Sequence, residues 1–212
     1  ESLSAKIPAG SICVINGSNG AGKTTLARLI ISLIEPTRGQ ILADGIELRQ
    51  VHPEWWRKQI IYMPQEPGFL NISIRENLTI NAPETETVKL NQIIDASDLR
   101  KFLDETPNGF ETQIMDNGRK LAVGIRRRLA LARALASGGK LVVLDEPTEG
   151  MDKGGSTVVS NVLSSLHSQG HTVIVTSHDP NIINKADIFI DLDTKPVPTI
   201  RIQEKKAVKG TK

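Results

Sequence analysis

A short glycine-rich segment near the N-terminus has the residue types and spacing of a loop that binds phosphate groups. The segment GSNGAGKT matches the pattern G-x-x-x-x-G-K-[ST]. Glycines allow the backbone to turn its N–H groups onto phosphate oxygens, and a helix that begins there adds the positive end of its dipole. We therefore expect the following residues to hold the phosphates of a nucleotide: Gly17, Ser18, Asn19, Gly20, Ala21, Gly22, Lys23, Thr24 and Thr25.

Three side chains of this segment have distinct expected roles. The Lys23 ammonium group would neutralise the β- and γ-phosphates, and the Thr24 hydroxyl would be a ligand of Mg²⁺. The Thr25 hydroxyl is placed to reach the α-phosphate. The segment follows an apolar strand-like run and precedes a helical pattern, which is the context in which this motif binds nucleotides.

A pair of adjacent carboxylates, Asp145 and Glu146, follows the apolar run KLVVL. A carboxylate at the end of a buried strand can hold Mg²⁺, usually through water. A second carboxylate beside it can orient or deprotonate an attacking water molecule. Together with the phosphate loop, the pair predicts hydrolysis of a nucleoside triphosphate, with Asp145 on the metal and Glu146 as the base.

The elements that must position these groups alternate between strands and helices. The runs SICVIN, QIIYMPQ, KLVVLDE and HTVIVTSH are short and rich in β-branched residues, and each ends in a polar or charged residue. Such runs indicate buried parallel strands whose carboxyl ends carry the chemistry of an α/β protein. A helix is expected over residues 23–34, and GQILADG predicts a short strand and turn.

The middle of the chain has a different pattern. Residues 72–137 are mostly helical in periodicity, and we interpret them as a helical subdomain inserted between two strands of the core. The predicted organisation is a first core part at residues 1–71, this helical part, a second core part at residues 138–203 and a basic tail at residues 204–212. The tail lacks apolar periodicity, so we expect it to be solvated.

Composition places the chain among globular proteins and gives no support for binding nucleic acid. Of its 212 residues, 39% are hydrophobic and 24% charged, and the net charge is only +2. No apolar run approaches the ~18–20 residues that a membrane span needs. The single cysteine, Cys13, is expected to be buried in a strand. The run Arg126-Arg127-Arg128 adjoins an apolar helical face, so we expect a solvated face or local ion pairs for it.

The phosphate loop, Gln65, LVVLDEPT and His178 occur in the order and context of the ATP-binding-cassette (ABC) ATPase domain, which the chain resembles over nearly its whole length. The resemblance implies a P-loop NTPase core of RecA type with a mainly parallel sheet, and ATP and Mg²⁺ as ligands. It also implies that Gln65 contacts Mg²⁺ and the attacking water, and that His178 contacts the γ-phosphate. The metal ligands would be Thr24, Gln65 and Asp145, and the catalytic groups Lys23, Gln65, Glu146 and His178.

The same resemblance implies a partner. Two such domains sandwich two ATP molecules head to tail, and Asp152 would lie at their interface. Each ATP is capped by a signature segment from the opposite domain, here residues 121–125. Transmembrane domains in the same full-length chain would be driven by the hydrolysis, which places the domain on the cytoplasmic face of a membrane. The phosphate loop begins close to the first residue of the sequence, which is expected of a domain cut from a longer chain.

Stretches such as MPQEPGFLNISIRENL and LDETPNGFETQIMDNG are similar to those of ABC exporters, including members that secrete peptides or proteins (type I secretion) and members that export thiols. In that branch residues 112–118 would lie against the coupling helices of the transmembrane domains. Exporters also place an adenine-stacking tyrosine upstream of the phosphate loop, and the upstream segment here contains no aromatic residue. That departure leaves the adenine contact open.

The signature segment departs from the family pattern L-S-G-G-Q. It reads Leu121, Ala122, Val123, Gly124 and Ile125, so that the serine hydroxyl and one glycine are missing. A lost hydrogen bond to a charged group costs about 1.5–3 kcal/mol, and valine is stiff where glycine would allow close approach. The predicted consequence is an impaired site at the partner's ATP, in a homodimer or a heterodimer. The alternative is that the remaining backbone N–H groups and the helix end are sufficient.

The sequence supports other functions less well. The segment NKAD, residues 184–187, matches the element that reads guanine in GTPases, but it precedes a strand-like run instead of ending one. A DNA-repair ATPase of the family would need a long coiled-coil insertion, which the sequence lacks. A weakly hydrolysing regulatory half of an asymmetric pair and an ABC ATPase without a transport role both remain open.

Overall fold

The structure is a computed structural model that describes residues 3–202. The predicted basic tail at residues 204–212 lies outside the described residues. In the described part, no helix combines the length and the apolar character that crossing a membrane requires.

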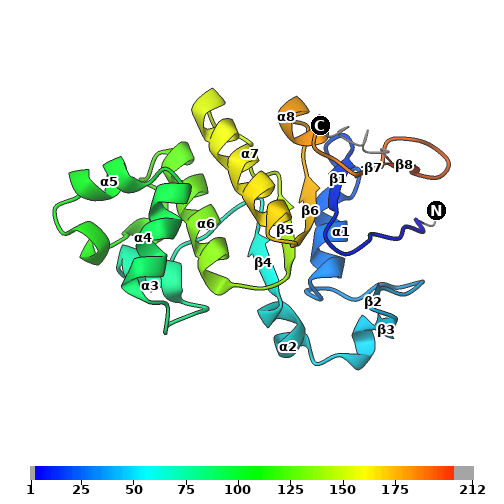
Figure 1. The fold of residues 1–212 in the computed structure, drawn as a ribbon, viewed down its shortest axis with the longest axis horizontal. Helices are drawn as coiled ribbons and strands as arrows, with labels where there is room; N and C mark the ends of the chain where they lie inside the picture. The colour runs from blue at the N-terminus through cyan, green and yellow to red at the C-terminus, as the bar shows by residue number, and fades with distance from the viewer. Residues whose placement is uncertain (1–2, 203–212) are drawn as a thin grey trace, which may run out of the picture.

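A six-stranded sheet forms the centre of the molecule (Figure 1). Its order is β4-β5-β6-β1-β7-β8, and all pairs are parallel except the last. The strands are β1 (Ile12–Asn16), β4 (Ile60–Met63), β5 (Leu141–Asp145), β6 (Thr172–Thr176), β7 (Ile188–Asp191) and β8 (Thr199–Ile202). The predicted α/β fold with a mainly parallel sheet is confirmed, and so are the four strand predictions.

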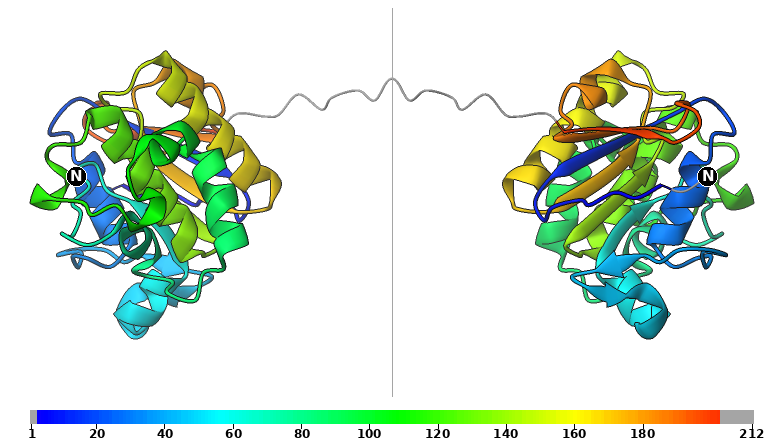
Figure 2. Two further views of the ribbon diagram at one scale, coloured as in Figure 1. Left: turned by 90° about the vertical axis from the view of Figure 1, so that its left-hand side faces the viewer. Right: turned by 90° about the vertical axis from the view of Figure 1, so that its right-hand side faces the viewer.

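Both faces of the sheet are covered, which explains why the strands read as continuous apolar runs. Alternate residues of each strand enter two separate buried clusters, as Val142 and Val143 of β5 illustrate. One cluster includes residues of α6 (Val123–Ser137) and α7 (Lys153–Ser168). The other includes Ala27 of α1 (Lys23–Ile30) on the opposite face. Figure 2 shows these helices on the two sides of the sheet.

Cys13 follows the prediction for a buried strand residue. It is fully buried in β1, and burial raises the pKa of its thiol to about 12. The thiol therefore remains protonated at neutral pH and packs as a small apolar side chain.

Helix α1 is shorter than the predicted residues 23–34, because it ends at Ile30. The chain then turns through Ser32, whose φ is 54°. Leu33 and Ile34 are exposed by 50% and 41%, so burial does not stabilise a further helical turn there. Pro36 also disfavours helical backbone at the residue that precedes it.

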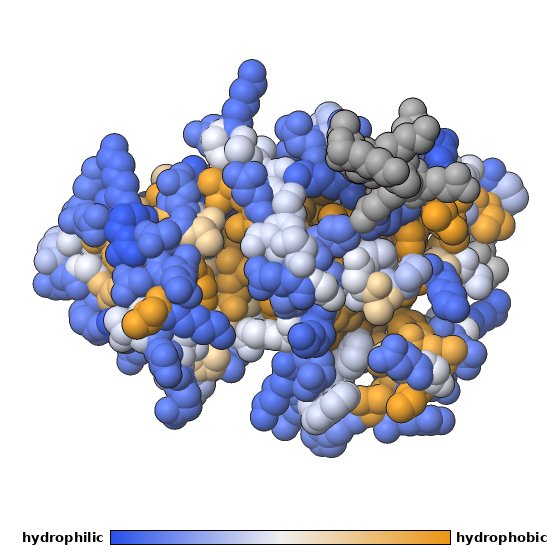
Figure 3. Space-filling model, in the orientation of Figure 1, coloured by the Kyte–Doolittle hydropathy of each residue, from blue (hydrophilic) through white to orange (hydrophobic). Residues whose placement is uncertain are grey.

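A small hairpin lies beside the end of α1. It consists of β2 (Leu42–Ala43) and β3 (Ile46–Glu47), joined by a two-residue turn, and is followed by α2 (Pro53–Lys58). Leu42 and Ile46 are both more than half exposed, and Figure 3 shows apolar surface in this region of the molecule. Trp55 of α2 is exposed, whereas Trp56 packs against the buried cluster and donates its indole N–H to Ile30 O.

Four α-helices lie between β4 and β5 in sequence, although these two strands are neighbours in the sheet. They form the green group at the left of Figure 1. Their bounds are α3 (Ile74–Thr79), α4 (Thr87–Ala96), α5 (Arg100–Glu105) and α6 (Val123–Ser137). A capping box begins α3, since the Ser73 hydroxyl accepts from Glu76 N while the Glu76 carboxylate accepts from Ser73 N.

Helix α6 is buried on more of its circumference than the sequence indicated. The expected apolar face is present, with Leu129 and Ala132 in the core. Arg127, however, is also buried, which corrects the expectation of a solvated face for the arginine run. The alternative of local ion pairs is the one observed, because Arg127 pairs with Glu149 and Arg128 pairs with Asp98.

Candidate functional site

The predicted functional residues follow strands that are neighbours in the sheet. The phosphate loop follows β1, and Gln65 follows β4. Asp145 ends β5 and Glu146 follows it, and His178 follows β6. The order β4-β5-β6-β1 contains no intervening strand, and all are parallel. Their carboxyl ends therefore meet at one edge of the sheet, the usual position of a ligand site in an open α/β fold.

Two glycines have conformations that explain the tight phosphate loop. Gly17 has φ 154°, and a Cβ atom there would lie 3.0 Å from both Ala21 Cβ and Leu192 Cβ. Gly22 has φ 104° and immediately precedes α1, whose first residue is Lys23. A side chain at either position would strain or crowd the turn that leads into the helix N-terminus. The helix dipole and the backbone N–H groups are thereby available for an anion.

Lys23 lies at the centre of the site. Its Nζ donates 2.5 Å to Gly17 O and lies 2.9 Å from His178 Nε2. Glu146 Oε1 lies 3.2 Å from the same Nζ and 3.4 Å from His178 Nε2. Lys23 and Glu146 are both buried, whereas the His178 side chain is about half exposed. The structure thus brings together the three residues that the sequence predicted to act on the γ-phosphate and the attacking water.

A threonine that the sequence analysis did not identify holds the acidic pair. The Thr176 hydroxyl donates 2.6 Å to Asp145 Oδ1 and accepts 2.8 Å from Glu146 N. Thr176 is paired with Asp145 in the register of β5 and β6, so the two strand ends fix each other. The signal was present, because Thr176 ends a strand two residues before His178.

Glu146 has an unusual backbone conformation. Its φ is 45°, in the left-handed region that side chains other than glycine, asparagine and aspartate rarely occupy. Strain of this kind costs about 1–3 kcal/mol and is maintained only where the surroundings fix it. Here the Glu146 N–H is fixed by the Thr176 hydroxyl, and the side chain is fixed by Lys23.

The donor set expected for Mg²⁺ fits that ion. The Thr24 hydroxyl donates 3.2 Å to Gln65 Oε1, which places both oxygens next to each other. Asp145 is fully buried, and its Oδ2 has no hydrogen-bond partner within residues 3–202. A buried carboxylate oxygen without a partner is costly unless it faces a cation or its water shell. A hydroxyl, an amide oxygen and a carboxylate are oxygen donors of the kind that Mg²⁺ binds.

Three further polar side chains adjoin the site. Asp193 accepts from both the backbone N–H and the hydroxyl of Ser18, each at 2.7 Å. Those two hydrogen bonds are the main reasons why the pKa of Asp193 lies below its usual range. Glu149 accepts from the side chain of Gln65, and Arg127 donates to the Gln65 main-chain carbonyl. Local sequence gives no signal for these contacts, because each joins segments far apart in the chain.

The predicted signature segment, residues 121–125, begins α6. Ala122 is the N-cap residue and provides no side-chain hydrogen bond to the helix, as expected for alanine. Ala122 and Val123 are exposed, whereas Leu121 and Ile125 pack against the core. Within the described chain, no hydrogen bond or ion pair joins the segment to Lys23 or the acidic pair.

Asp152, predicted for a dimer interface, has a role within the chain. It is the N-cap of α7, where its Oδ1 accepts 2.7 Å from Gly155 N. The guanine-reading alternative does not fit, because Asp187 of the segment NKAD accepts 2.8 Å from Ile12 N. Ile12 begins β1 and the phosphate loop follows its other end, so Asp187 lies at the opposite edge of the sheet.

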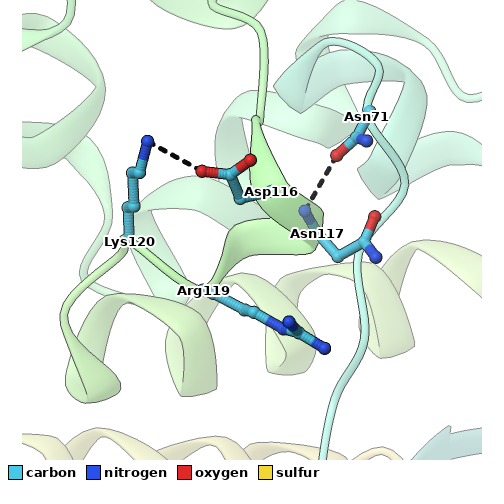
Figure 4. A pocket seen from close by; sticks show the side chains of 5 residues that line it. All are labelled: Asn71, Asp116, Asn117, Arg119 and Lys120. Carbon is cyan, nitrogen blue, oxygen red and sulfur yellow. Dashed lines mark hydrogen bonds and ion pairs between the residues drawn. The ribbon is translucent and has the colours of Figure 1, made fainter.

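A polar hollow lies on the helical region, away from the sheet edge. Figure 4 shows the side chains that line it: Asn71, Asp116, Asn117, Arg119 and Lys120. Asn117 N donates 2.8 Å to Asn71 Oδ1, and Lys120 pairs with Asp116 at 2.7 Å. The hollow adjoins residues 112–118, the stretch expected to face a transmembrane partner.

Comparison with known proteins identifies one family. The family profile described as ABC transporter matches residues 1–149. ABC transporter B family member 1 of Arabidopsis thaliana is 31% identical over 204 residues, which are 96% of this chain and 16% of that protein. The ATP-dependent lipid A-core flippase of Ralstonia nicotianae is 34% identical over 196 residues, or 91% of this chain and 33% of that protein.

Solved structures give the same result. A structure described as a bacterial Atm1-family ABC exporter with ATP bound superposes with a TM-score of 0.84 at 28% identity. The match covers 90% of this chain and 33% of that one. The chain thus spans a third or less of the length of the proteins named here.

Proposed function

Because this chain belongs to the ABC transporter family, we propose that it is the nucleotide-binding domain of an exporter, which binds ATP with Mg²⁺ and hydrolyses it. The observation that carries the proposal is the contact of Lys23 with both Glu146 and His178 at the mouth of the phosphate loop. A buried cation, a carboxylate and an imidazole meet there beside an available helix N-terminus.

Each residue has a role in the proposed reaction. Backbone N–H groups of the loop and the Lys23 ammonium group bind the β- and γ-phosphates. Glu146 accepts a proton from the attacking water, and His178 donates a hydrogen bond to the γ-phosphate. Thr24, Gln65 and Asp145 would hold Mg²⁺, which supplies charge stabilisation for the transferred phosphoryl group.

Arrival of ATP changes the partners of Lys23. The γ-phosphate and the Glu146 carboxylate are both anions, and the phosphate would compete for the ammonium group that Glu146 contacts. Binding of the phosphate therefore releases Glu146 from Lys23, so that the carboxylate is available to the water. The base is in this way coupled to the presence of its substrate.

The proposed assembly is a head-to-tail dimer of two such domains. The dimer lies on the cytoplasmic face of a membrane and is joined to transmembrane domains. Support comes from the relatives, which include a lipid flippase and an Atm1-family exporter, and from the exposure of Ala122 and Val123 at the start of α6. In this arrangement residues 121–125 contact the partner's ATP and Asp152 lies at the interface. The hollow around Asn71 and Arg119 would receive the transmembrane partner. A peptide or a protein is one proposal for the exported substrate.

The test is the equilibrium binding of ATP to the purified protein and to two variants. Lys23→Ala should reduce ATP affinity by at least about tenfold, since it removes a charge-assisted contact. Glu54→Gln on the exposed surface of α2 is the control and should match the unchanged protein. Equal binding by all three would contradict the proposed nucleotide site.

A second candidate is a regulatory half of an asymmetric pair that hydrolyses ATP weakly. The observation that favours it is the uncapped start of α6, where alanine and valine replace the serine and glycine of the family pattern. The substitutions affect the partner's ATP and leave Lys23 and Glu146 of this chain intact. Mixing the chain with candidate partners and counting nucleotides hydrolysed per dimer distinguishes the two candidates.

A further inference from the structure

Three segments that are far apart in sequence meet at one side chain, Gln65. Its amide Nε2 donates 3.0 Å to Glu149 Oε2, in the loop after β5. Arg127 of α6 donates through one nitrogen to Gln65 O and through another, at 3.2 Å, to the same Glu149 Oε2. Gln65 is thus held through its main chain by the arginine and through its side chain by the glutamate.

The chemistry of Glu149 determines which end of the Gln65 amide faces it. A carboxylate only accepts hydrogen bonds, so it binds the NH₂ end of an amide and disfavours the oxygen end. The amide oxygen is therefore directed the other way, toward the Thr24 hydroxyl, which lies 3.2 Å from Oε1. The Thr24 hydroxyl can donate or accept and exerts no such selection. The orientation of Gln65 thus depends on the negative charge at residue 149.

Arg127 holds the Glu149 carboxylate in place. The Glu149 side chain is 53% exposed, so alone it would be free to turn into solvent. The Arg127 side chain is only 10% exposed, and a buried guanidinium group needs a counter-charge. Its planar fork serves two acceptors at once, which a lysine could not do in the same geometry.

We propose that Glu149 and Arg127 are positioning residues that direct the Gln65 oxygen toward the Mg²⁺ site and tie it to α6. The proposal rests on the metal role assigned to Gln65 under the proposed function. It also connects the start of α6, residues 121–125, with the metal site of the same chain, because Arg127 lies in the first turns of that helix. Partners that orient a metal ligand typically change metal affinity by about 10- to 100-fold when they are lost.

The first experiment replaces Glu149→Gln, which keeps the size of the side chain and removes its charge. A glutamine can donate or accept, so it no longer selects one orientation of Gln65. We expect the affinity for Mn²⁺, measured by electron paramagnetic resonance with a non-hydrolysable ATP analogue, to fall about tenfold. Nucleotide affinity without divalent metal should be unchanged.

Asp98→Asn is the matched control. Asp98 pairs at 3.1 Å with Arg128, the residue that follows Arg127 in α6, and the Asp98 side chain is 62% exposed. The change removes one carboxylate from an arginine of the same helix, but it lies away from Gln65. Mn²⁺ affinity should stay within twofold of the unchanged protein. Equal Mn²⁺ affinities in Glu149→Gln and Asp98→Asn would overturn the proposal.

A second arm tests Arg127. Arg127→Lys keeps the charge and loses the double hydrogen bond, so we expect a loss of Mn²⁺ affinity close to that of Glu149→Gln. The double variant should lose little more than either single variant, because both act on one side chain. Fully multiplicative losses would show that the two residues act independently and would contradict the proposal.

Gln65→Ala separates this inference from the proposed function. If it leaves Mn²⁺ affinity unchanged, Gln65 is not a metal ligand, and both the metal assignment and the positioning role fail. If it lowers the affinity while Glu149→Gln does not, only the positioning role fails. Thermal unfolding of each variant confirms that the affinities are compared between folded proteins.

Discussion

The ammonium group of Lys23 lies 3.2 Å from Glu146 Oε1, and the two side chains are only 7% and 10% exposed. The proposed phosphate-binding cation and the proposed base are therefore direct partners. In a pair with this little exposure, removing one member leaves the other as an uncompensated buried charge. Several consequences of this arrangement are measurable.

Replacement of the proposed base should separate binding from hydrolysis. Glu146→Gln removes the proton acceptor, and loss of a general base typically costs about 10²- to 10⁴-fold in rate. It also removes the anion that competes with the γ-phosphate for Lys23, so ATP affinity should be equal or higher. Phosphate release and equilibrium nucleotide binding measure the two effects. Turnover at the rate of the unchanged protein would exclude Glu146 as the base.

The Thr176 hydroxyl should matter for both stability and catalysis. Thr176→Val keeps the shape and the strand preference of the side chain but removes the donor to Asp145 Oδ1. A hydrogen bond to a charged group contributes about 1.5–3 kcal/mol, so unfolding by denaturant should show a loss in this range. Hydrolysis should also fall, because the strained backbone of Glu146 loses a partner.

Thr199→Val is a suitable control for that measurement. Thr199 lies on β8, the edge strand three places from β6 in the sheet, and the same atoms are exchanged there without loss of a hydrogen bond to Asp145. Its unfolding free energy should change by less than about 0.5 kcal/mol. Equal stability losses in the two variants would show that the Thr176 hydroxyl has no special role.

Asp193 should make part of the stability depend on pH. Its pKa lies below the ordinary value of 3.8, mainly because the Ser18 hydroxyl and backbone N–H donate to the ionised form. A lowered folded-state pKa gives a contribution that is present above the unfolded value and lost as pH falls through the folded value. The stability difference between the unchanged protein and Asp193→Asn should therefore be constant at neutral pH and shrink below about pH 4. A difference that persists undiminished at pH 2 would contradict this origin.

The effect of the signature residues can be tested without disturbing the core. Ala122→Ser together with Val123→Gly restores the hydroxyl and the glycine at exposed positions. We expect faster hydrolysis and stronger ATP-driven dimerisation, by roughly 10- to 100-fold for one recovered hydrogen bond to a charged group. Analytical ultracentrifugation with ATP and rate measurements detect both.

Ile125→Gln belongs in a separate variant, because Ile125 packs against the buried cluster and a polar amide there should cost stability. Val88→Gly is the control for the glycine, since Val88 is also exposed near the start of a helix. If the restored pair behaves like the unchanged protein, the remaining backbone N–H groups suffice and the segment is not impaired.

The strands and the polar residues at their carboxyl ends could be predicted because local pattern determines them. Apolar runs that end in Asp145, Gln65 or His178 are visible in the sequence, and parallel strand ends must share an edge. The length of α1 could not be predicted, because its last turn depends on whether Leu33 and Ile34 find a surface to bury against. The burial of Arg127 was missed for a similar reason, as its counter-charge Glu149 is 22 residues away.

The backbone conformation of Glu146 could not be predicted from the sequence either. Glutamate has no preference for φ 45°, and the conformation is imposed by the neighbouring strand through Thr176. Asp193 reaches Ser18 only because β7 pairs with β1. Contacts of this kind depend on the assembled sheet and on no local pattern.

The sheet order also has a consequence for how the protein is made. Within this chain β1 is synthesised before the other strands of the six-stranded sheet, yet its two neighbours in that sheet, β6 and β7, follow only after β4 and β5. At about 5–20 residues per second, Ile12 waits roughly ten to thirty seconds for Val173. A nascent chain halted before residue 172 has no strand to pair with β1. The strands on both sides of β1, which precedes the phosphate loop, are therefore present only once residue 191 has been synthesised.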